Sequence, residues 1–120
     1  MRVRFRIQLY EGDKRLRKQD LFDRKDAFGV GIRYITEFKY LEATKWLLLA
    51  PDSWEKYVLL SLINLSLGQV EQAQEFLEMA GGFERETRLR IEVSFPERGT
   101  SMEVKEFPDV MSLFAQTPPG

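Results

Sequence analysis

The chain has 120 residues, of which 43% are hydrophobic and 31% are charged, and its formal net charge is −1. This length and balance are typical of one globular domain and exclude a disordered segment. The chain contains no Cys and no His, which excludes a disulfide framework, a thiolate or His zinc site and a His-based catalytic triad.

The longest apolar run, Trp46 to Ala50, is far shorter than the roughly 18 residues that a membrane-spanning helix needs. We therefore expect a cytoplasmic protein with no membrane partner. No motif in the chain points to catalysis, to a cofactor or to a metal. We therefore expect a protein that is not an enzyme and that binds neither a cofactor nor a metal ion.

Residues 1–22 are predicted to form a β-hairpin. Val3, Phe5, Ile7 and Leu9 alternate with polar residues, which is typical of a strand with one buried face. A turn at Gly12-Asp13 places Leu9 opposite Leu16 and Val3 opposite Phe22. The same register places Lys18 and Asp20 on the buried face, which indicates a weak second strand at the sheet edge.

Residues 23–82 are predicted to form a helical layer. Asp23 is expected to cap the first helix, and Pro51 interrupts the helical pattern. The next helix is expected at residues 54–67, capped by Asp52 or Ser53 and ended by Gly68, and another at residues 70–80.

Residues 83–116 are predicted to form a second β-hairpin and a short helix, followed by a tail at residues 117–120. Alternation from Thr87 to Phe95 predicts one strand, residues 102–107 a weaker one, and Pro108-Asp109 the start of the helix. We expect one α+β domain in which both hairpins share one antiparallel sheet around the helical layer.

A pattern in the helical layer occurs twice, thirty residues apart. Its members are Val30-Gly31, Tyr34, Ala43, Leu47 and Ala50 in the first unit, and Leu60-Ser61, Asn64, Ala73, Leu77 and Ala80 in the second. With Tyr57 and the turn residue Gly68, this pattern resembles the tetratricopeptide repeat family over about residues 24–82. The period of thirty is shorter than the family's roughly 34 residues, as if about one helical turn were deleted before Pro51.

Phe38 stands where the first unit should have a turn glycine. This leaves open whether residues 23–50 form one long helix or a helical hairpin. The second unit shows where a break belongs, which favours the hairpin.

The resemblance implies a concave groove, lined by the first helix of each unit, that receives a polypeptide. The corresponding partner-binding residues are Phe28, Ile32, Ile35, Val58, Leu62 and Leu65, with Thr36 and Ser66 beside them. Left open to water, this apolar lining would mark an interface. The strands also need cover for their apolar faces, and we favour a groove filled by the sheet, which would move partner binding to outer helix faces or to a sheet edge.

A second candidate surface is the polar face of the first hairpin. It gathers Arg2, Arg4, Arg6, Arg15 and Arg17, with Tyr10 opposite Arg15, and Arg88 and Arg90 can join from the C-terminal strand. Arginines with an aromatic on a sheet face are one way to bind RNA, whereas a solvated strand face explains the same residues.

The function that we predict is a non-enzymatic protein–protein interaction module, such as an adaptor, small chaperone or complex subunit. Nucleic-acid binding through the basic face is the alternative. Homodimerisation is an open expectation, because two repeats are fewer than the roughly three that usually make a stable stack.

Overall fold

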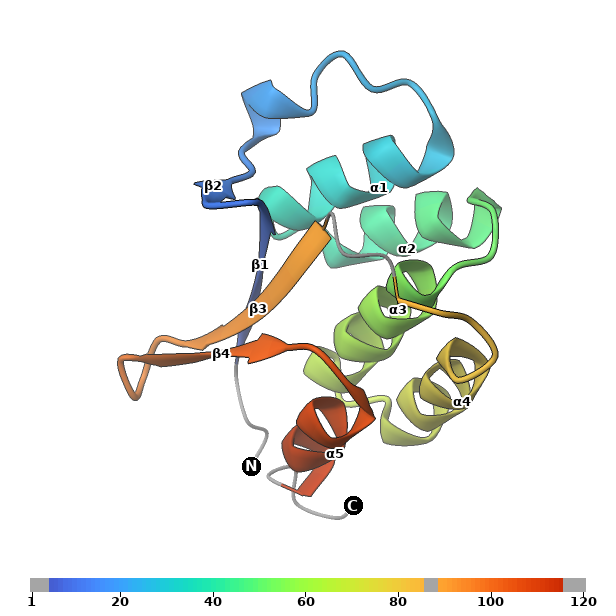
Figure 1. The fold of residues 1–120 in the computed structure, drawn as a ribbon, viewed down its shortest axis with the longest axis vertical. Helices are drawn as coiled ribbons and strands as arrows, with labels where there is room; N and C mark the ends of the chain where they lie inside the picture. Colours follow the sequence, from blue (N-terminus) through green and yellow to red (C-terminus); the bar gives the residue numbers. More distant parts are fainter. Residues whose placement is uncertain (1–4, 86–88, 116–120) are drawn as a thin grey trace.

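The computed structural model describes residues 5–85 and 89–115, which form two helical hairpins, a sheet and a C-terminal helix (Figure 1). The strands are β1 Arg6–Glu11, β2 Lys14–Arg15, β3 Leu89–Phe95 and β4 Thr100–Val104; the helices are α1 Ala27–Thr36, α2 Tyr40–Leu49, α3 Trp54–Ser66, α4 Val70–Ala80 and α5 Phe107–Ala115. The predicted α+β class is confirmed, with N- and C-terminal strands joined in one antiparallel sheet.

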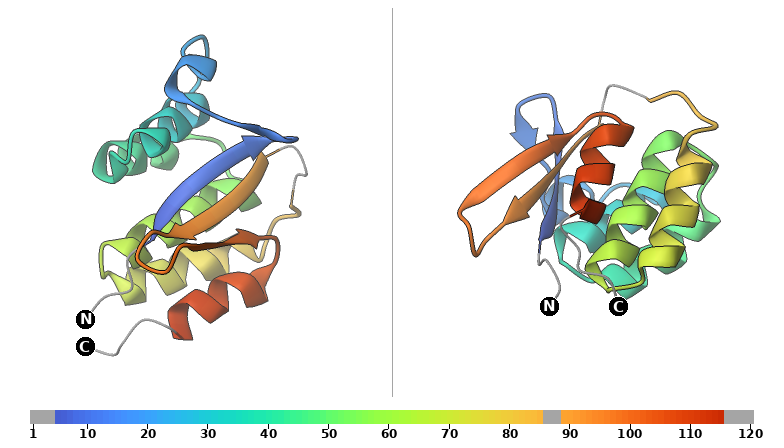
Figure 2. Two further views of the ribbon diagram at one scale, coloured as in Figure 1. Left: turned by 90° about the vertical axis from the view of Figure 1, so that its left-hand side faces the viewer. Right: turned by 90° about the horizontal axis from the view of Figure 1, so that it is seen from below.

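The sheet has the strand order β2-β1-β3-β4, and all three pairings are antiparallel. Alternate residues of β1 and β3 are buried, as the period-two pattern predicts, and Leu9 lies opposite Ile91. The helices lie on the side of this apolar face (Figure 2), so the sheet and the helical hairpins form two layers around one core.

The first hairpin turns at Gly12-Asp13 as predicted. Tyr10 pairs with Arg15, and the Leu16 N–H donates to the Leu9 carbonyl at 2.8 Å. The predicted length of the second strand is wrong, because β2 has only two residues and the chain leaves it for a 3₁₀ turn at Lys18–Asp20.

This early exit has a physical reason. A longer β2 would have placed Lys18 and Asp20 against the core, whereas the turn leaves them at the surface, where Asp20 forms an ion pair with Lys14 at 2.9 Å. Leu21 is then buried and Phe22 is 58% exposed, so the predicted contact of Phe22 in the sheet is not made. Val3, its predicted partner, lies outside the described residues.

The first helix begins later than predicted. Asp26, rather than Asp23, caps α1, and its carboxylate accepts from the Gly29 N–H at 3.0 Å. Arg24 precedes the helix and forms an ion pair with Glu11 at the end of β1.

Residues 23–50 form a helical hairpin, not one long helix. Phe38 has a φ of 60°, and Gly68, thirty residues later, has a φ of 81°. In both turns the N–H of the next residue donates to the carbonyl five residues before it. Lys39 donates to Tyr34 at 3.0 Å, and Gln69 donates to Asn64 at 2.8 Å. Phe38 therefore adopts the turn conformation that glycine supplies in the second hairpin, at some cost in backbone strain.

The small residues of the repeated pattern lie where the paired helices approach most closely. A Cβ atom at Gly31 would come within 3.0 Å of the Leu47 side chain. At the equivalent contact between α3 and α4, the Ser61 hydroxyl donates to the Ala73 carbonyl at 2.7 Å. Both α3 and α4 have the predicted bounds to within one residue, and the Ser53 hydroxyl caps α3.

The C-terminal strands follow the prediction with one shift. β4 lies about two residues earlier than predicted, because the helix already begins at residue 107. The Asp109 carboxylate accepts from the N–H groups of Lys105 and Glu106, which fixes the start of α5, and Val110 and Leu113 bury the helix in the core.

Candidate functional site

The groove lining predicted from the repeat pattern lies inside the core. Ile32, Ile35, Val58, Leu62 and Leu65 are at most 2% exposed, and Phe28 is half-buried at the edge of the cluster. The same cluster contains the apolar residues of β1 and β3. Of the two alternatives, the structure has the groove filled by the sheet, so the five buried side chains have no free surface for a partner.

The predicted basic face is only partly visible, because Arg2, Arg4 and Arg88 lie outside the described residues. Arg6 lies with its guanidinium 4.9 Å from the centre of the Phe38 ring. Arg15 and Arg17 are exposed, and among the described residues neither side chain forms an ion pair.

The described part of the outer sheet face carries both signs of charge. On this face the register places Glu92 of β3 between Gln8 of β1 and Glu103 of β4. Arg90 forms an ion pair with Glu92 at 3.4 Å and lies over the Tyr10 ring at 4.5 Å. Tyr10 is therefore covered on one side, and the described part of this face carries acidic as well as basic side chains, which does not favour binding of single-stranded RNA.

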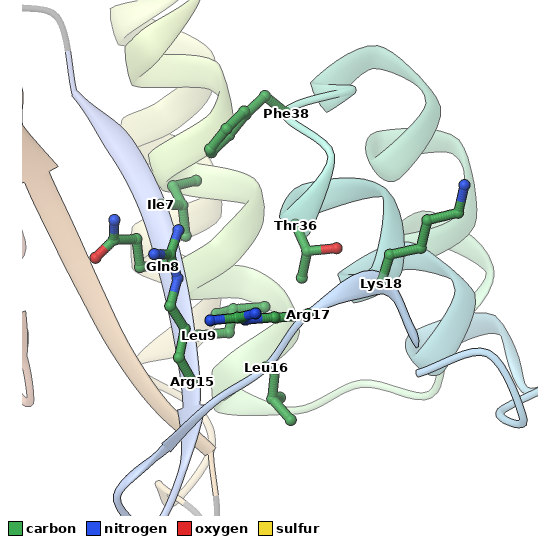
Figure 3. A pocket seen from close by; sticks show the side chains of 9 residues that line it. All are labelled: Ile7, Gln8, Leu9, Arg15, Leu16, Arg17, Lys18, Thr36 and Phe38. Carbon is green, nitrogen blue, oxygen red and sulfur yellow. The ribbon is translucent and has the colours of Figure 1, made fainter. Parts of the chain in front are cut away.

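A small cavity of about 200 Å³ lies at the edge of β1 (Figure 3). It forms because β2 ends after two residues, so the edge of β1 has no strand beside it beyond Leu9. Among the described residues, one further group bonds to this edge, the Tyr40 hydroxyl, which accepts from the Ile7 N–H at 3.1 Å. Burial of this hydroxyl raises the pKa of Tyr40.

Positive charge gathers at the mouth of this cavity. Arg15 and Arg17 extend over the cavity beside β1, whereas Lys18 points away from it and forms an ion pair with Glu37 (Figure 3). Phe38 closes the far side. The cavity has room for a small anion, but its charged groups are exposed, and exposed arginines hold such ions weakly.

The outer face of α2 is apolar and open to solvent. Leu41, Leu48 and Leu49 are 64%, 52% and 73% exposed, and Trp46 is partly exposed beside them. No described segment covers them. With the exposed residues Glu42 and Lys45, we call this surface the α2 face.

The equivalent face of α4 is mainly acidic, and its exposed apolar residue is Met79, the equivalent of Leu49. Thirty residues after Leu41, Lys45 and Leu48 the chain has Glu71, Glu75 and Glu78, all of them exposed. The buried positions of the two helices match, since Ala43 and Leu47 correspond to Ala73 and Leu77. The two helices therefore bury the same kind of residue and differ in what they present to solvent.

The sequence prediction named the groove residues and, for a filled groove, outer helix faces or a sheet edge in general, but it did not single out the α2 face. Helical spacing places Leu41, Lys45 and Leu48 on one stripe, within about 60° of one another. A comparison of this stripe with its acidic counterpart on α4 would have identified it from the sequence.

Two kinds of site find no support in the described residues. They contain no helix long and apolar enough to cross a membrane, and no cluster of three acidic side chains placed to hold a metal ion. No protein-family model, no curated protein and no solved structure matches the chain.

Proposed function

We propose that the protein is a non-enzymatic protein–protein interaction module whose docking surface is the α2 face. The observation that carries this proposal is the contrast between α2 and α4: Leu41 and Leu48 have glutamate at the equivalent positions of α4, whereas Leu49 corresponds to the exposed Met79. Exposed apolar residues clustered on one surface mark binding sites more often than scattered ones do.

Binding at the α2 face has a sufficient driving force. Full burial of a leucine side chain is worth about 1.5–3 kcal/mol, and each of Leu41, Leu48 and Leu49 is more than half exposed. A helix or strand of a partner with an apolar stripe of its own would remove most of this area from water.

We also propose kinship with the tetratricopeptide repeat family. Two hairpins with the same turn geometry and close helix contacts, thirty residues apart, support it. Under this proposal the sheet occupies the family's usual groove, and the outer surface of the helices takes over partner binding. We place this role in the cytoplasm, and a chain without Cys, which needs no disulfides, fits a reducing compartment.

The test compares two double variants of the immobilised full chain in extract of the cells that make it. Leu41→Glu with Leu48→Glu gives α2 the outer residues of α4, and Glu71→Ala with Glu78→Ala is the matched control on α4. We expect a polypeptide that the wild type and the control retain and that the α2 variant loses, with unchanged circular dichroism in all three. Equal retention by the α2 variant would refute the α2 face as the docking surface.

A further inference from the structure

We infer that the α2 face binds a second copy of this chain, through antiparallel contact of the two α2 helices about a two-fold axis. This inference rests on the proposed function, because it names the occupant of the same surface. Its starting point is the pair of charges within the face: Glu42 and Lys45 have opposite signs, and neither forms an ion pair among the described residues.

The order of residues along α2 suits this symmetry. A two-fold axis perpendicular to the helix places each residue opposite a residue of the second copy. The two residues lie on the same side of the helix face and at equal distances from the axis, one toward the N-terminus and the other toward the C-terminus. An axis at the level of Thr44 sets Leu41 against Leu48 of the second copy on one side. Lys45 borders this leucine stripe and Glu42 lies about 60° further around the helix, so the same axis brings Glu42 near Lys45 of the second copy. Each contact occurs twice, so one arrangement joins four leucines and two ion pairs.

The outer face of α4 has no such self-complementarity. Glu71, Glu75 and Glu78 have the same sign, so two α4 faces would repel each other. Of these two outer helix faces, the α2 face is the one whose charges and apolar residues both complement a second copy of itself.

A contact through one helix face is small. It lies below the roughly 800 Å² per partner of a standard stable interface. We therefore expect a reversible dimer that dissociates in the micromolar range, visible as a concentration-dependent mass.

The experiment is sedimentation velocity of the full chain and its charge variants. Glu42→Lys and Lys45→Glu each place like charges together twice, and we expect each alone to weaken the dimer about tenfold. Mixing the two single variants pairs opposite charges again at both contacts, so the mixture should associate like the wild type. The double variant Glu42→Lys/Lys45→Glu should do so too. Glu71→Lys and Glu75→Lys on α4 are matched controls, expected to leave association unchanged.

Three results would overturn the inference. They are a wild type that stays monomeric at about 100 µM, single variants that associate as well as the wild type, or a mixture of single variants that does not regain association. If the wild type is monomeric but still captures another polypeptide through Leu41 and Leu48, self-association is refuted and the proposed function is not. If the Leu41→Glu/Leu48→Glu variant captures as much of that polypeptide as the wild type does, the proposed function of the α2 face is refuted instead.

Discussion

Replacement of Leu62 by Glu tests whether the repeat groove is filled by the sheet. Leu62 is completely buried in the core cluster that also contains the apolar residues of β1 and β3. Truncation of such a leucine to Ala costs about 2–5 kcal/mol through lost burial and the cavity that remains. Glu must in addition place its carboxyl group in an apolar site, which adds a further penalty of a few kcal/mol or raises its pKa.

We expect Leu62→Glu to lose at least about 4 kcal/mol, a large part of the roughly 5–15 kcal/mol that stabilises an ordinary domain. Urea unfolding followed by far-UV circular dichroism measures the loss. With a urea dependence of about 1–3 kcal/mol per molar, the midpoint should fall by more than about 1 M, or the variant should be unfolded without urea. The deficit should shrink as the pH is lowered toward about 4, because burial favours the protonated carboxyl.

The control is the same substitution at Leu41 on the α2 face. Because Leu41 is 64% exposed, Leu41→Glu should change stability by less than about 0.5 kcal/mol. Both variants are compared at low protein concentration, so that self-association contributes nothing to the midpoint. A Leu62→Glu variant within about 1 kcal/mol of the wild type would refute the filled groove.

Three further predictions concern local features of the fold. Gly68→Ala should cost about 1–2 kcal/mol in urea unfolding, because the residue has a φ of 81° that an alanine adopts with strain. Gly31→Val should cost about 1–3 kcal/mol in the same assay, because its side chain would press on Leu47 at the crossing of α1 and α2. The Asp52 pKa lies below its ordinary 3.8, chiefly because the Tyr57 hydroxyl donates to the carboxylate at 2.7 Å. The stability from this contact is therefore present above about pH 4 and lost as the pH falls through the lower folded pKa, and urea midpoints compared across this range should fall less in Asp52→Asn than in the wild type.

Local patterns were enough to predict most of the elements. Alternation predicted β3, whose four apolar residues are all buried, and Gly12-Asp13 predicted the register of the first turn. Ser53 and Gly68 marked both ends of α3. These signals act within a few residues, so they can be read without knowing how the chain packs.

The errors arose where a distant contact decides between two local options. Asp23 and Asp26 can each cap a helix, and the ion pair between Arg24 and Glu11 of the sheet favours the second. The length of β2 depended in the same way on the cost of burying Lys18. Whether the groove was open or filled depended on where the sheet packs, which the order of elements alone did not decide.

The filled groove and the exposed α2 face follow from the same packing. The apolar faces of β1 and β3 need cover, and the lining of the first helices, including Leu62, supplies it. The fold thus uses the inner surface of the repeats for its own stability, which leaves the outer helices for contact with other molecules. On these helices, Glu71 and Glu78 suit the fold of α4, so folding does not require leucines at the equivalent positions 41 and 48 of α2. Because exposed leucines add little to the stability of the monomer, their clustering on α2 is best explained by a contact that buries them.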